Sequence, residues 1–400
     1  MAASSLVSQS ALPLIPVARP LLPRAEVLLP YLQRIDASRI YSNQGPLVRE
    51  LQDRLSAHFR IPTGTVAAVA NATIGITLAL SASGARPGTL CLMPAWTFAA
   101  SAHAAVSAGL RPYFLDVDPV TWALSPTTVL ATVDRLGRDL VGAVMPVSPF
   151  GAPIDAKSWD VFHEQTRIPV VIDAAAGFDT AEPTLVPAVV SLHATKVLGA
   201  GEGGFVLTRD PALMIEVQRR TNFGFWGARE ARVAATNGKL SEYGAAVGLA
   251  SLDQWPETRA SWISVAQSYR KALADRPGLT PMPGLGSYAS STCVVHVATE
   301  LGETGPAALR MAARGVTTRH WWGRGLQQEA AFANCPRDAL PVTEALGTQT
   351  LGLPCSVDLT RREVTRACAA LTDVLDVSNR LRAAQKSATV TDCIATAQFA

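Results

Sequence analysis

The residues best suited to chemistry in this sequence are one lysine and one aspartate. Lys196 lies between a segment that contains Ser191 and a glycine-rich run at 199–204. Asp173 directly follows a short apolar segment, 168–172, and small residues come after it. An acid at the end of a buried strand and a lysine 23 positions later can meet across a bound cofactor.

Pyridoxal 5'-phosphate (PLP) chemistry needs such a pair. A lysine amine forms a Schiff base with the cofactor aldehyde, and a carboxylate facing the pyridine nitrogen keeps that nitrogen protonated. The protonated ring accepts the negative charge left when a proton leaves the substrate carbon. We therefore expect Lys196 and Asp173 to be catalytic, with Lys196 as the acid and base that moves the proton.

The glycine-rich run has two other interpretations. Residues 199–204 formally match the pattern G-x-G-x-x-G, but a dinucleotide-binding site needs that pattern to follow a strand and open a helix. Here the glycines run into the apolar segment 205–207, which is typical of a strand. A surface lysine beside a flexible loop would not explain the neighbours of Lys196.

The remaining elements must position this pair. Alternating apolar and helical patterns predict strands at 66–70, 89–93, 111–119 with its exit turn, 141–147, 168–172 and 205–207, and helices at 47–59, 76–81 and 211–223. This alternation favours an α/β fold with a mostly parallel sheet flanked by helices. Ligands of such sheets bind at the carboxyl ends of the strands.

The residues around the lysine resemble a known family. Ser191-Leu-His-Ala-Thr-Lys-Val-Leu-Gly-Ala-Gly-Glu-Gly-Gly, with Asp-Ala-Ala upstream, is similar to the DegT/DnrJ/StrS sugar aminotransferases of the fold type I superfamily. The similarity runs from about residue 15 to about residue 375. It implies an arm and a large PLP-binding domain at 1–260, a smaller α/β domain at 261–385, and a flexible tail at 386–400.

The resemblance also assigns a site for the cofactor phosphate. Residues 71–75 open a helix, where free backbone N–H groups and the helix dipole favour an anion. In the family this turn holds the phosphate, which implies the same role for the backbone of Ala72 and for Thr73. The resemblance implies that Ser191, before the lysine, also binds the phosphate. A threonine that only caps the helix would look the same in sequence.

Two further cofactor contacts follow from the resemblance. Phe98, in a Pro-x-x-Thr-aromatic pattern, is expected to stack on the pyridine ring, although Trp96 is a neighbour and core packing is commoner for any one aromatic. Residues 235–242 resemble the signature Gly-x-Asn-x-(Arg/Lys)-Met-Ser-Glu. In relatives this asparagine reaches the phosphate of the other subunit, so Asn237 implies at least a homodimer.

Three positions depart from the family pattern or stay open. Ala176 stands where relatives commonly have Gln or His, so one hydrogen bond to the cofactor or substrate is missing. The segment 319–323 is unusually aromatic, which fits either substrate choice or domain packing. His193 either assists Lys196 or is a packed, hydrogen-bonded histidine.

The resemblance implies transfer of an amino group from an amino acid, L-glutamate being the first candidate, to a nucleotide-linked keto-sugar. A dehydratase branch of the family has histidine in place of the lysine, so Lys196 favours aminotransfer. A PLP-binding sensor without catalysis is the other alternative. No DNA-binding segment accompanies the chain, and the full set of site residues favours the enzyme.

Composition excludes several other classes. The chain has 400 residues, 48% hydrophobic and 17% charged, which is typical of a globular protein of two or three domains. A net charge of +3 without basic runs argues against a nucleic-acid partner, and the apolar runs are too short for a membrane span. Six cysteines without metal-ligand spacing indicate reduced thiols, no metal and a cytoplasmic protein. The proline-broken segment 1–23 is expected to be an extended arm and not a signal peptide.

Overall fold

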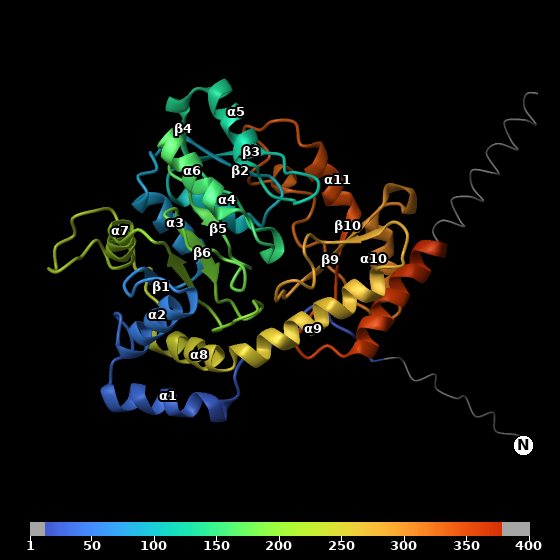
Figure 1. Cartoon of the computed structure of the whole chain (residues 1–400), viewed down its shortest axis with the longest axis horizontal. Helices are drawn as coiled ribbons and strands as arrows, with labels where there is room; N and C mark the ends of the chain where they lie inside the picture. Colours follow the sequence, from blue (N-terminus) through green and yellow to red (C-terminus); the bar gives the residue numbers. More distant parts are fainter. Residues whose placement is uncertain (1–12, 378–400) are drawn as a thin grey trace, which may run out of the picture.

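The structure is a computed structural model that describes residues 13–377 (Figure 1). The tail predicted at 386–400 and the first part of the expected arm lie outside these residues. No helix within 13–377 has both the length and the apolar character needed to cross a membrane.

The larger sheet is built from two sets of paired strands. One set has the order β1 (Val66–Val69), β7 (Gly204–Leu207), β6 (Ala188–Ser191), β5 (Ile172–Asp173), and the other β3 (Arg111–Leu115), β2 (Leu90–Pro94), β4 (Val141–Val144). Parallel bridges from Val144 to Val170 and from Val147 to Asp173 join β4 to the β5 side. Only β7 runs antiparallel to its neighbours within this layer, so the mostly parallel sheet is confirmed.

Two predicted strands are shorter than expected. The pattern at 141–147 gives β4 only as far as Val144, and the pattern at 168–172 gives β5 only from Ile172. Pro146 and Pro169 lie in the missing parts. Because proline has no N–H to donate, it interrupts the ladder there.

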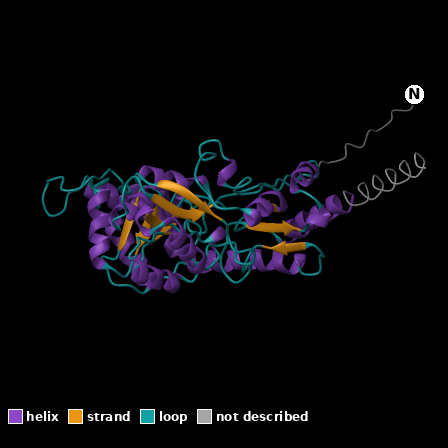
Figure 2. Ribbon diagram, turned by 90° about the horizontal axis from the view of Figure 1, so that it is seen from above, coloured by secondary structure: helices purple, strands orange, loops and turns teal. Residues whose placement is uncertain are grey.

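Helices cover both faces of this sheet (Figures 1 and 2). Along β1, Val66 and Ala68 belong to one hydrophobic cluster, whereas Ala67 and Val69 belong to the other. This alternation places one cluster on each face. The helices of this part are α1 (Ala25–Ser38), α2 (Pro46–Phe59), α3 (Ala72–Ala82), α4 (Ala99–Ser107), α5 (Pro126–Leu136), α6 (Ala156–Thr166), α7 (Pro211–Thr221) and α8 (Glu242–Asp253), with short 3-10 turns at Arg138–Leu140 and Pro149–Gly151.

A second sheet lies in the C-terminal part. It is antiparallel, in the order β10 (Thr350–Leu353), β9 (Cys293–Val297), β8 (Leu279–Pro281). The helices here are α10 (Thr304–Ala312), α11 (Pro341–Gln349) and the helical residues 361–377, with 3-10 turns at Thr299–Leu301 and Leu326–Gln328. The N-terminal arm pairs with this part through Ile15 and Ala18, which bridge to Val316 and Cys355.

One long helix, α9 (Trp255–Leu273), links the two parts (Figure 1). Trp255 at its start packs edge-on against Phe178, with ring centroids 4.7 Å apart. Near its end, the Tyr269 hydroxyl donates to the carbonyl of Pro354 at 2.6 Å. Residue 261, the predicted domain boundary, lies inside this helix, and the division into two domains stays a prediction.

Candidate active site

The carboxyl ends of several strands open into one cavity of about 520 Å³. Asp173 ends β5, Ser191 ends β6, and Asn71 follows β1. All three line the cavity, together with Lys196 and Phe98. The prediction that ligand-binding residues gather at this edge of the sheet therefore agrees with the positions of these side chains.

Asp173 is held rigidly at the floor of the cavity. The Ser101 hydroxyl donates to its Oδ2 at 2.6 Å, and the Ala175 N–H donates to its Oδ1 at 3.0 Å. Burial raises the pKa of this carboxyl, while these two hydrogen bonds and the charge of Lys196 act in the opposite direction. The carboxylate is thus fixed in orientation with few competing contacts.

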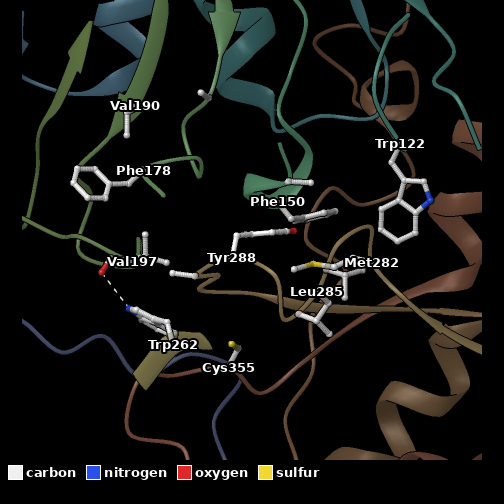
Figure 3. Packing of buried hydrophobic residues seen from close by; sticks show 14 of the residues in the cluster. Trp122, Phe150, Phe178, Val190, Val197, Trp262, Met282, Leu285, Tyr288 and Cys355 are labelled. Carbon is white, nitrogen blue, oxygen red and sulfur yellow. Dashed lines mark hydrogen bonds between the residues drawn. The ribbon is translucent and has the colours of Figure 1, made fainter. Parts of the chain in front are cut away.

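The loop that carries Lys196 is fixed by two helices. The indole N–H of Trp262, from α9, donates to the Val197 carbonyl at 3.1 Å (Figure 3). The Ser251 hydroxyl, from α8, donates to the Gly199 carbonyl at 2.6 Å. These bonds on the C-terminal side of the lysine hold its backbone against the rest of the site.

The Lys196 side chain is partly buried. Burial lowers its pKa, and the charge of Asp173 opposes that shift. No salt bridge joins the two side chains within residues 13–377, although both line the same cavity. The arrangement leaves an acid and an amine facing a shared space.

The start of α3 lines one part of the cavity and could bind an anion through its first amides. Asn71 caps this helix by accepting from the Ile74 N–H at 2.9 Å, so the amides of Ala72 and Thr73 stay available at the first turn. A Cβ atom on Gly204 would lie 2.9 Å from the Ala72 nitrogen. Glycine at this position therefore lets the paired strands β6 and β7 approach the helix start closely.

Ser191 lies opposite Gly204 in the strand pair. Its hydroxyl oxygen accepts from the His193 N–H at 3.2 Å. The hydroxyl hydrogen is therefore free for a ligand oxygen. His193 itself contacts the Thr195 hydroxyl at 2.8 Å through Nδ1.

The two candidate aromatic residues have different environments. Phe98 precedes α4, is 61% exposed and lines the cavity. Trp96 is buried and packs edge-on against Trp322, with ring centroids 5.3 Å apart. Phe98 is thus the aromatic side chain available to a ligand, and Trp96 belongs to the core.

Asn237 lies apart from the other predicted site residues. It is exposed, bridges to Asn222, and is not among the residues that line the cavity of its own chain. Ala176 does line the cavity and presents only a methyl group there.

Sequence reasoning missed three contributors to the site. Ser101, one turn into α4, holds Asp173, but only the packing of α4 over the sheet brings these residues together. Residues 18–21 of the arm and Arg319 of the C-terminal part also line the cavity. No local pattern predicts contacts over such separations, although the segment 319–323 is unusually aromatic.

Comparison with known proteins now identifies the class. A lysine-bearing loop between β6 and β7, an acid ending β5 and an anion-ready α3 define a fold type I transferase, as in a putative PLP-dependent aminotransferase from Bacillus cereus (TM-score 0.83, 26% identity, 90% of this chain and 100% of that chain). The chain belongs to the DegT/DnrJ/EryC1/StrS aminotransferase family, whose sequence profile matches residues 25–372.

Two other relatives extend the comparison. The structure of DesI in the presence of its TDP-sugar product is similar with a TM-score of 0.83 and 30% identity, over 94% of this chain and 96% of that one. Protein Rv3402c of Mycobacterium tuberculosis is 34% identical over 281 residues. That match spans 66% of each chain, just under two thirds.

Proposed function

We propose that this protein is a PLP-dependent aminotransferase that moves an amino group from an amino acid, L-glutamate in the first instance, to a nucleotide-linked keto-sugar. One observation carries the proposal. Lys196, which is partly buried, and Asp173, which is buried, line the same cavity, and the start of α3 lines it too. Family membership supports the aminotransferase activity, and the TDP-sugar product of DesI supports the substrate class.

The residues that line the cavity fit both the phosphate and the pyridine ring of PLP. The amides of Ala72 and Thr73 and the hydroxyl of Ser191 would hold the phosphate, because a helix start and a free hydroxyl both favour an anion. Phe98 would cover one face of the ring, and Asp173 would contact its nitrogen. When bound, PLP supplies an aldehyde that combines with amines and a ring that withdraws electrons.

Lys196 moves the proton in this scheme. Because burial lowers the pKa of its amine, the uncharged form is more abundant near neutral pH than in an exposed lysine. With PLP bound, the uncharged Nζ of Lys196 would be the group that accepts a proton from the substrate carbon, holds it and gives it back. Ser101 donates to the Asp173 carboxylate and would hold it in place to face the ring nitrogen.

We also propose a homodimer with shared sites. Asn237 is exposed on its own chain, which leaves it available to the cofactor phosphate of a second copy. We place the protein in the cytoplasm, since the five cysteines described in residues 13–377 are all free thiols.

An absorption experiment tests the proposal. Purified protein is saturated with PLP, freed of unbound PLP, and scanned before and after L-glutamate is added. We expect a visible band that moves to the ultraviolet as one 2-oxoglutarate forms per site. Lys196→Ala should remove the band, whereas Lys157→Ala, an exposed lysine on α6, should keep it. A band that does not respond to any amino donor would contradict the aminotransferase.

A further inference from the structure

We propose that Arg319 binds the diphosphate of the nucleotide-linked sugar at the mouth of the cavity, and thereby selects nucleotide substrates over free sugars. The proposal rests on the proposed function for its substrate class. Arg319 comes from the C-terminal part, lines the same cavity as Lys196, and has an exposed side chain.

Among the positively charged side chains described in the cavity wall, Arg319 is the one with no ion-pair partner and no role in the proposed reaction. The charged residues and the histidine that line the cavity are Arg19, Asp173, His193, Lys196, Glu202 and Arg319. Arg19 is neutralised by Asp358 at 3.1 Å and Glu363 at 3.6 Å. His193 lies 3.7 Å from Glu202, and Lys196 and Asp173 serve the chemistry. Within residues 13–377 Arg319 forms no ion pair.

The guanidinium of Arg319 is already oriented. Its Cζ lies 4.9 Å from the ring centroid of Trp321. A cation over an aromatic face uses the flat side of the guanidinium, so the N–H edge stays free. Such an edge matches two oxygens of a phosphate.

The backbone beneath this pair is fixed by β10. Arg319 and Gly352 exchange two hydrogen bonds, of 3.0 Å from the Arg319 N–H and 2.8 Å from the Gly352 N–H. A Cβ atom on Gly352 would lie 2.3 Å from Nε1 of Trp321. The glycine therefore allows Trp321 to lie against β10 and to support the guanidinium.

Depth in the cavity distinguishes the diphosphate from the carboxylate of an amino donor. That carboxylate is attached to the reacting carbon and must lie beside Lys196, which is less exposed than Arg319. In a nucleotide-linked keto-sugar, the sugar ring separates the keto carbon from the diphosphate. An exposed guanidinium at the mouth therefore matches the diphosphate.

Calorimetric titration of the PLP-loaded protein with dTDP and with UDP tests the proposal. We expect wild-type protein to bind at least one of the two ligands. Arg319→Gln should raise the Kd of that ligand by roughly ten-fold, the loss typical of a charged hydrogen bond. The KM for L-glutamate should not change. Arg324→Gln is the matched control, because Arg324 lies in the same segment, pairs with Glu303 at 3.7 Å and is not among the residues lining the cavity.

Three results would overturn the role of Arg319. These are wild-type affinity in Arg319→Gln, an effect confined to the KM for L-glutamate, and a wild-type protein that binds neither diphosphate. The titration needs no turnover. Loss of binding in Arg319→Gln alongside an inactive wild-type protein would therefore refute the proposed reaction and leave the diphosphate site standing.

Discussion

At the scale of single residues, Asp173 is the group on which the electron-withdrawing role of the ring depends. It is buried, and two hydrogen bonds fix its two oxygens. Asp173→Asn keeps the shape but cannot hold a proton on the ring nitrogen. We expect kcat to fall roughly 10² to 10³-fold, as when an electrostatic contact at the reacting centre is removed.

Steady-state kinetics with PLP-saturated Asp173→Asn checks this expectation. Ser101→Ala is the companion variant, because it loosens the carboxylate without removing it. Its kcat should lie between those of wild type and Asp173→Asn. A wild-type kcat in Asp173→Asn would show that the acid does not act on the ring.

Lys196 gives a pH-dependent prediction. Burial lowers the pKa of its amine from the ordinary value of 10.5, and the uncharged amine is the form that reacts with an aldehyde. The initial rate of PLP attachment should therefore rise with pH and reach half its maximum below 10.5. Rapid-mixing absorbance with PLP-free protein measures this midpoint. A midpoint at or above 10.5 would contradict the effect of burial on the amine.

At the scale of elements, Glu242 at the start of α8 stabilises the start of α2. Its carboxylate accepts from the amides of Leu47 and Val48 at 2.8 and 2.9 Å, and the residue is 1% exposed. A Cβ atom on Gly45 would lie 2.6 Å from the Glu242 carboxyl carbon, so the turn before α2 packs directly on this side chain.

Glu242→Ala should lower the free energy of unfolding by about 3 kcal/mol, since two buried amides lose a charged acceptor. Chemical denaturation of the PLP-free protein measures the change. Glu257→Ala, at an exposed position in the first turn of α9, is the control and should have little effect. Equal stability of the two variants would show that the α2 contact contributes nothing.

Local patterns predicted the elements that hold Lys196 and Asp173. Strand ends and glycine runs depend on neighbouring residues, so β5, β7 and the lysine loop could be predicted. The contact of Ser101 with Asp173 spans 72 positions and depends on how α4 packs. The place of Arg319 depends on how the C-terminal part sits against the sheet. The elements not predicted include β6 and the helices α1, α4, α5, α6 and α8, and the predicted domain boundary at 261 lies inside α9.

At the scale of the whole molecule, the proposed homodimer makes a prediction about mixed subunits. If Asn237 completes the site of the partner, Lys196→Ala on one subunit and Asn237→Ala on the other fall in the same site of a mixed dimer and leave the second site intact. Equal amounts reassociated at random should then regain about a quarter of the wild-type activity, because half of the dimers carry one intact site of two. Activity of the mixture is compared with that of each variant alone. No recovery, with mixed dimers verified by mass, would place Asn237 outside the partner's site.

The most direct test of the central claim is to find where PLP attaches. The PLP-loaded protein is reduced with borohydride, digested, and analysed by mass spectrometry. We predict one pyridoxyl group per chain, on Lys196, and none there in Lys196→Ala. A pyridoxyl group on another lysine, or no modification at all, would contradict the assignment of this cavity as the active site.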